Sequence, residues 1–302
     1  MSTRPSFGSR LEISGLVALV AFTVTALLGY GLFALRPQNL VGVPYAAEFF
    51  AISFRFFAQL HIVLCFAALA IVLVSRTGLR WLPTLAAVYA LSLTSEHLGT
   101  GYGIPFGGYS YSTLLGIRVG PRVPALIPLS WFLMALPSWV IARAAFPGSR
   151  SARMALAAFG LVLWDLALDP AMSSLTTYWR WEETGPYYGM PWMNLLGWYV
   201  TGLALMGAIE FFARGRALDG LPVRWMMTYW GVVLLMPIGM LSAAGSWLGV
   251  VTTLVAIGAT TAVVTTLRAM GVASGTAREV EGEVGSQHGG REASPVAMTV
   301  RA

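Results

Sequence analysis

The sequence predicts an all-α polytopic integral membrane protein, a helical bundle of about eight transmembrane helices with both termini in the cytoplasm. Three observations lead to this fold class. Of the 302 residues, 57% are hydrophobic and only 11% are charged, whereas a soluble globular domain carries about 25% charged residues. The apolar residues form runs long enough to cross a bilayer, and the arginines lie mainly between these runs.

The apolar runs give the number of helices. A hydrocarbon core about 30 Å thick needs about 20 apolar residues per helix. Eight runs approach this length, and the third is short. They are Ile13–Leu35, Phe50–Val74, Trp81–Ser95, Val123–Phe146, Met154–Met172, Pro191–Phe212, Trp225–Ala243 and Ser246–Met270. The first run lacks a small-residue cleavage site, so we interpret it as an anchor helix and not as a signal peptide.

The arginines give the orientation. With the N-terminus inside, 14 of the 19 arginines fall in inner segments, four fall in outer loops and Arg55 lies within the second run. This distribution follows the positive-inside rule, so the net charge of +6 reflects membrane topology and not nucleic-acid binding. We expect a multi-pass protein of the cell inner (plasma) membrane. Residues 1–270 form a single transmembrane domain in this interpretation, and the polar residues 271–302 form a disordered cytoplasmic tail.

Several residue types are scarce enough to exclude classes of membrane protein. The sequence has no lysine, so no retinal Schiff base can form. Three histidines, His61, His97 and His288, are too few for a di-iron hydroxylase or desaturase. The single cysteine, Cys65, lies in an apolar run and supports neither a disulfide nor a zinc site.

Polar residues collect in two outer connections, Ser95–Pro124 and Asp165–Trp198. Asp165 and Asp169 are four residues apart and therefore project from one helix face. An ionised Asp at membrane depth costs about 2.5–3.5 kcal/mol, which indicates a functional role for at least one of them. Desolvation and mutual repulsion favour the protonated form of one carboxyl group, and a protonated carboxyl in an apolar site is a general acid.

Other polar residues have both structural and functional interpretations. Glu96 and His97 diverge by about 100° on a helix, so both can face one cavity only if the helix ends there. We interpret His61, with Arg55 and Gln59 on nearby turns, as part of a structural polar network. We also expect Glu210 and Arg214, four residues apart at a helix end, to form an ion pair.

Aromatic residues are abundant in the two outer connections. Most can be explained by an interfacial aromatic belt, although some can line a cavity and stabilise a cation through their π faces. The glycines and prolines of Gly103–Gly107 and Tyr188–Pro191 indicate tight turns, which a belt does not require. The candidate substrate-binding residues are Tyr102, Phe106, Tyr109, Trp181, Tyr188 and Trp198.

These two connections resemble the membrane carotenoid-biosynthesis family that contains the carotenoid 1′,2′-hydratases and the bisanhydrobacterioruberin hydratases. The resemblance covers roughly Ala46–Arg214. The matching stretches are Glu96–Thr100, Gly103–Gly107, Tyr109–Tyr111, Leu168–Pro170, Trp179–Trp181, Tyr188–Pro191 and Asn194–Trp198. The resemblance implies hydration of the terminal double bond of an acyclic ψ-end carotenoid without a redox cofactor or a metal. The expected partners are a membrane-dissolved carotenoid, water and the lipid bilayer.

This reaction assigns roles to the polar residues. A proton delivered to C2′ leaves a tertiary carbocation at C1′, which water captures while a base removes the excess proton. We expect Asp169 or Asp165 to be the acid and Glu96 with His97 to be the base that positions water. Asn194 would orient the water. The cation-stabilising wall is expected from Trp181, Tyr188 and Trp198.

Three alternatives remain open at this point. A carotene cyclase shares the protonation step and differs only in what quenches the cation. A polyprenyl transferase is suggested by the Asp165-x-x-x-Asp169 spacing, but the membrane region has no second acidic cluster to share magnesium ions. A lipid carrier or channel is disfavoured because the two halves show no corresponding broken helices.

Overall fold

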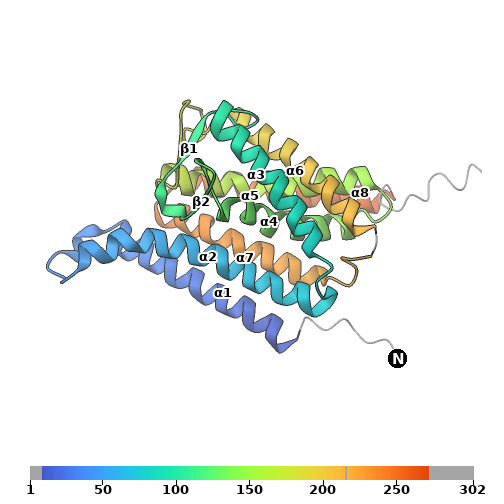
Figure 1. Cartoon of the computed structure of the whole chain (residues 1–302), viewed down its shortest axis with the longest axis horizontal. Coiled ribbons are helices and arrows are strands. Elements are labelled where there is room, and N and C mark those ends of the chain that lie inside the picture. The colour runs from blue at the N-terminus through green and yellow to red at the C-terminus, as the bar shows by residue number, and fades with distance from the viewer. Residues whose placement is uncertain (1–8, 215, 272–302) are drawn as a thin grey trace, which may run out of the picture.

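The computed structural model describes residues 9–214 and 216–271, which form a bundle of eight α-helices (Figure 1). Seven of them are long and apolar enough to span a membrane, and the exception is the third. The protein is therefore an all-α, multi-pass membrane protein. The helices are α1 (Arg10–Gly29), α2 (Ala46–Thr77), α3 (Leu82–Tyr102), α4 (Leu126–Ala145), α5 (Arg150–Asp169), α6 (Trp192–Ala213), α7 (Val223–Ala243) and α8 (Trp247–Ala269).

Shorter elements lie mainly at one end of the bundle. Two π-helical turns continue α1 and α5. The antiparallel pair of β1 with β4 joins the two outer connections, and β2 pairs with β3 within the first of them. The short helical elements are η1 (Tyr30–Ala34), η2 (Pro37–Leu40), η3 (Thr113–Leu115) and η4 (Pro170–Ser174). The strands are β1 (Tyr109–Tyr111), β2 (Arg118–Val119), β3 (Val123–Pro124) and β4 (Trp179–Trp181).

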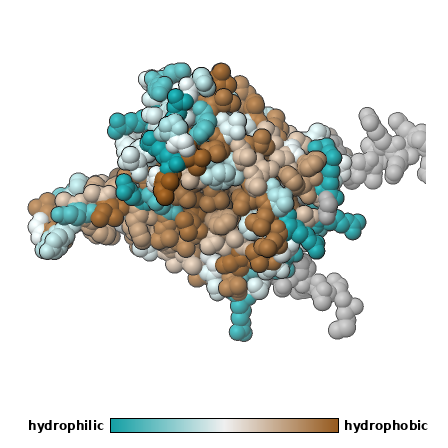
Figure 2. Space-filling model, viewed as in Figure 1, coloured by the Kyte–Doolittle hydropathy of each residue, from teal (hydrophilic) through white to brown (hydrophobic). Residues whose placement is uncertain are grey.

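The bundle has α4 and α5 at its centre. Most of the α4 side chains are buried, and α4 packs against α3, α5 and α7. In Figure 1, α3 and α6 lie on one side of this central pair, and α1, α2 and α7 lie on the other. Figure 2 shows an apolar surface over the middle of the molecule with hydrophilic residues towards its two ends, as expected for a bundle that crosses a bilayer.

One end of the bundle is held by two buried glutamates. Glu12 at the start of α1 accepts hydrogen bonds of 2.7 Å from Ser75 and Arg76 of α2. Glu210 of α6 pairs with Arg153 of α5, at 2.8 Å between Oε2 and Nη2, and accepts the indole N–H of Trp139. The expected pair between Glu210 and Arg214 is therefore wrong. A partner on the neighbouring helix replaces the one on the same helix, and the guanidinium of Arg214 lies over the ring of Phe211 instead.

The third helix differs from its prediction in a way that matters for the site. The apolar run predicts a helix that ends at Ser95, but α3 continues to Tyr102, where Gly103 adopts a left-handed conformation with φ 71°. Glu96 and His97 therefore lie inside a helix. The predicted tail, residues 271–302, falls almost wholly outside the described part of the chain.

Candidate active site

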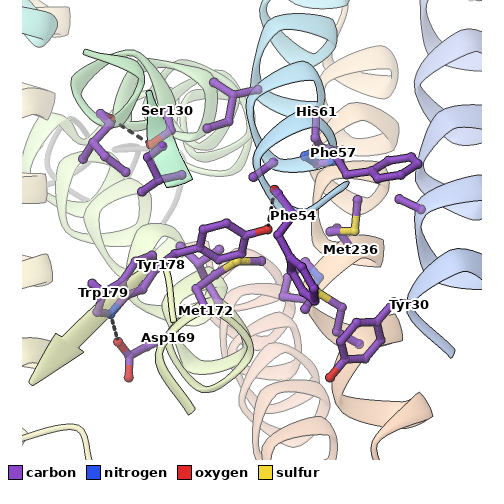
Figure 3. A pocket seen from close by; sticks show the side chains of 18 of the residues that line it. Tyr30, Phe54, Phe57, His61, Ser130, Asp169, Met172, Tyr178, Trp179 and Met236 are labelled. Carbon is purple, nitrogen blue, oxygen red and sulfur yellow. Dashed lines mark hydrogen bonds between the residues drawn. The ribbon is translucent and has the colours of Figure 1, made fainter. Parts of the chain in front are cut away.

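A cavity of about 440 Å³ lies in the half of the bundle that carries the strands (Figure 3). Side chains from α1 to α7 and from β1 and β4 line it, and most of them are apolar. Among these side chains are the carboxylates of Glu96, Asp165 and Asp169 and the amide of Asn194. Four residues that were predicted as catalytic, and that come from the three helices α3, α5 and α6, thus share one cavity.

The pairing of β1 with β4 explains how the two outer connections contribute together. Tyr109 pairs with Trp181 and Tyr111 pairs with Trp179. Alternate residues of a strand point to opposite faces, so these four aromatic side chains share the face that lines the cavity. The residues between them, Ser110 and Arg180, are exposed.

Glu96 is held by three donors. Its Oε2 atom accepts the hydroxyl groups of Tyr109 and Tyr111, the latter at 2.7 Å, and its Oε1 atom accepts the indole N–H of Trp131 at 2.8 Å. Burial raises the pKa of both tyrosine hydroxyls well above the usual value, and the negative charge of Glu96 adds to this effect. Both hydroxyls therefore stay protonated and donate. Oε1 accepts only this one hydrogen bond among the described residues and retains a lone pair.

Asp169, the last residue of α5, accepts hydrogen bonds on both oxygens. Its Oδ1 atom lies 2.7 Å from Nε1 of Trp179 and 3.1 Å from Nε1 of Trp181. Its Oδ2 atom lies 3.2 Å from Nε1 of Trp181 and 3.3 Å from Oγ of Ser173. Figure 3 shows the bond from Trp179. Donors thus surround this carboxylate, which favours its ionised form because an ionised carboxylate only accepts.

Asp165 differs from both. Its Oδ2 atom accepts the amide of Asn194 at 2.7 Å, which joins α5 to the first turn of α6. Its Oδ1 atom is buried and has no hydrogen-bond partner among the described residues. A buried oxygen without a partner is rare in proteins, and this one belongs to a side chain that lines the cavity. It is free to bond to a substrate or a water molecule.

Indole rings form a large part of the wall beside these carboxylates. The rings of Trp131 and Trp198 are stacked, with centroids 4.0 Å apart. Trp164 meets Trp198 edge to face at 5.8 Å, and Trp181 packs on Tyr109 at 5.2 Å. Aromatic faces carry partial negative charge and attract cations, so this wall can stabilise positive charge in the absence of bulk water.

Phe106, Tyr109, Trp181 and Trp198, four of the predicted substrate-binding residues, line the cavity. His97, Tyr102 and Tyr188 do not. Because α3 continues past Glu96, His97 points away from its neighbour and lies with Tyr102 beside a separate outer depression. The hydroxyl of Tyr188 bonds to the backbone of Ser246 and Gly249 in the loop before α8 and at its start.

Several residues of the cavity were not predicted from the sequence. Trp131 and Trp164 lie inside apolar runs. The only signal in the sequence is that a buried indole N–H needs a hydrogen-bond partner. His61 was expected in a network with Arg55 and Gln59. It lines the cavity instead, with Nε2 3.3 Å from Oγ1 of Thr23. Tyr111, Tyr178 and Trp179 also line the cavity, although they were not among the predicted substrate-binding residues.

Comparisons with known proteins identify the family of this chain. The sequence profile of a family described as carotenoid biosynthesis protein matches residues 57–260. The bisanhydrobacterioruberin hydratase of Haloarcula japonica is 30% identical over 132 residues, which cover 41% of this chain and 44% of that hydratase. This chain therefore spans less than half the length of that relative. No solved structure matches. Since the profile covers more than half of the chain, including every carboxylate of the cavity, this protein belongs to the carotenoid biosynthesis protein family.

Proposed function

We propose that this protein is a hydratase that adds water across the terminal C1′,C2′ double bond of an acyclic ψ-end carotenoid, in the cell inner membrane. Membership of the family and the similarity to a hydratase support this reaction class. The observation that carries the mechanism is the difference among the three carboxylates. Asp169 is surrounded by donors, Glu96 retains a lone pair, and Asp165 has an oxygen without a partner.

Asp165 is the proton donor in this proposal. With a proton on Oδ1 it transfers that proton to C2′ of the substrate, and the electrons of the double bond form the new C–H bond. The tertiary carbocation at C1′ then lies among the indole rings near the ionised Asp169. Fixed charges and dipoles in a site without bulk water stabilise such a cation strongly, because they need no reorganisation as the charge develops.

Glu96 completes the reaction as the base. A water molecule bonds to C1′ through an oxygen lone pair, and the resulting oxonium loses one proton to Oε1 of Glu96. The product is a tertiary alcohol, and the substrate has gained one water. The proton returns from Glu96 to Asp165 through water before the next turnover. His97 takes no part, since it does not line the cavity.

Expression in a bacterium that accumulates lycopene or γ-carotene tests this function. We expect a product heavier by one water, with an unchanged polyene spectrum and a hydroxyl group that can be silylated. An isomer of unchanged mass with a shifted spectrum would identify a cyclase, and a gain of five carbons would identify a prenyl transferase. Unchanged pigments with both substrates would contradict the proposal.

A further inference from the structure

The outer half of the α1–α2 hairpin is packed very differently from its inner half. In α2, no residue from Ala46 to Leu64 is buried, whereas Cys65 and several residues after it are buried in the core. The π-helical turn η1, which continues α1 on the other arm of the hairpin, has no buried residue either. In Figure 1 this end of the hairpin extends beyond the rest of the bundle.

The inward side chains of this outer half face the cavity. Phe54 and Phe57 of α2 are half-buried and line it together with Tyr30 of η1. Figure 3 shows Phe54 between Tyr30 on one side and Asp169 on the other. We call this part of the cavity the hairpin groove. Its wall consists of Tyr30, Phe50, Phe54, Phe57, Met236 and Met240.

The hairpin groove is continuous with the carboxylates and is held in place. The hydroxyl of Tyr178 donates to the carbonyl of Phe54 at 2.9 Å, and the amide of Gln59 donates to the carbonyl of Leu114 at 2.9 Å. These bonds join the outer half of α2 to the connections that carry the catalytic aromatic residues. The groove is thus a fixed apolar extension of the same cavity, and its aromatic and thioether side chains suit a hydrocarbon chain.

The cavity is too small for a whole carotenoid and opens towards lipid. Pockets of roughly 300–1,000 Å³ enclose ligands of drug size, so about 440 Å³ holds an end group and a short piece of the polyene. Three apolar side chains at its edge are largely exposed, Leu28 by 59%, Leu32 by 45% and Phe49 by 56%. In a membrane-spanning bundle such surfaces face acyl chains.

We infer that the hairpin groove holds the polyene next to the reacting end and lets the rest of the substrate pass into the bilayer, so that the distal end is not recognised. The inference rests on the proposed function and extends it to a substrate class. Any carotenoid with one acyclic end is a substrate, and a molecule with two such ends reacts at each end in separate binding events.

Two glycines provide a matched test. A Cβ added to Gly29 or to Gly31 meets no atom within 4 Å, but only Gly29 lines the cavity. We would purify wild type, Gly29→Phe and Gly31→Phe from cells that accumulate lycopene, and measure bound pigment per protein by visible absorption and hydration by mass. We expect Gly29→Phe to lower both by about tenfold or more, with Gly31→Phe and the melting temperatures of both variants as in wild type.

The outcomes separate this inference from the proposed function. Wild-type pigment binding in Gly29→Phe, equal losses in Gly29→Phe and Gly31→Phe, or wild-type protein that purifies without pigment would each overturn it. Pigment bound by wild type but never hydrated would instead contradict the proposed function, and the two glycine variants would still test the groove through binding. A difference of about tenfold or more in the hydration of substrates with cyclic and with acyclic distal ends would also overturn the inference about the hairpin groove.

Discussion

The side-chain amide of Asn194 donates a 2.7 Å hydrogen bond to Oδ2 of Asp165 and so fixes one oxygen of that carboxyl group. Both side chains are buried, at 2% and 1% exposure. The other carboxyl oxygen of Asp165, Oδ1, has no hydrogen-bond partner among the described residues. In the proposed mechanism Asp165 is the general acid, which must hold its proton in a fixed direction, and this contact between α5 and α6 would provide that direction.

Replacement of the acid is the most direct test of the mechanism. Asp165→Asn keeps the size of the side chain but removes the transferable proton, and we expect hydration to fall by roughly 10²–10⁴-fold, the usual contribution of a general acid. The product is measured by liquid chromatography with mass detection. The matched control is Asp219→Asn, at an exposed residue that pairs with Arg143 and does not line the cavity. Hydration by Asp165→Asn at the wild-type rate would contradict the mechanism.

The positioning role of Asn194 makes a separate prediction. Asn194→Ala leaves the carboxyl group of Asp165 in place but free to rotate, so we expect kcat to fall by about tenfold while KM changes little. Asn194→Gln, which can still donate, should recover part of the loss. A rise in KM at constant kcat would instead indicate that Asn194 contributes to substrate binding only.

The sequence predicted which carboxylates line the cavity better than it predicted where the helix beside them ends. The spacing of Asp165 and Asp169 placed both on one helix face, and both line the cavity. The role of His97 depended on a helix end at Ser95. The helix continues because residues 96–102 can still form helical hydrogen bonds, and a left-handed glycine ends it only at Gly103. Hydropathy could not locate this end, since it responds to side-chain polarity and not to backbone conformation.

Contacts between segments that are distant in the sequence could not be predicted from local sequence patterns. The Glu210–Arg153 pair and the pairing of Tyr111 with Trp179 join segments that are separated by more than fifty residues. Local spacing favoured Arg214 for Glu210 because it lies one helical turn away. The packing of α5 on α6 determines the actual partner, and that packing depends on the whole bundle.

The indole wall should influence the rate through its faces. Trp198 lines the cavity and stacks on Trp131. A cation–π contact contributes about 0.5–2 kcal/mol, so we expect Trp198→Leu to lower kcat by about twofold to about 30-fold. Trp198→Phe, which retains an aromatic face, should lose less. Equal rates for the two variants in a hydration assay would show that size alone matters at this position.

The ion pair of Glu210 with Arg153, at the other end of the bundle, should contribute to the stability of the fold and not to the rate of hydration. Arg153→Ala leaves the buried carboxylate of Glu210 with the indole N–H of Trp139 and a longer ion pair to Arg150, whose Nε lies 3.9 Å from Oε2. Hydrogen bonds to a charged group contribute about 1.5–3 kcal/mol, so we expect a clear fall in the melting temperature in detergent. Arg214→Ala is the matched control, because Arg214 lies over Phe211 and makes no ion pair among the described residues. The folded fraction of Arg153→Ala should hydrate carotenoid at the wild-type rate, since Glu210 does not line the cavity. If Arg214→Ala were as unstable as Arg153→Ala, the assignment of Arg153 as the partner of Glu210 would be wrong.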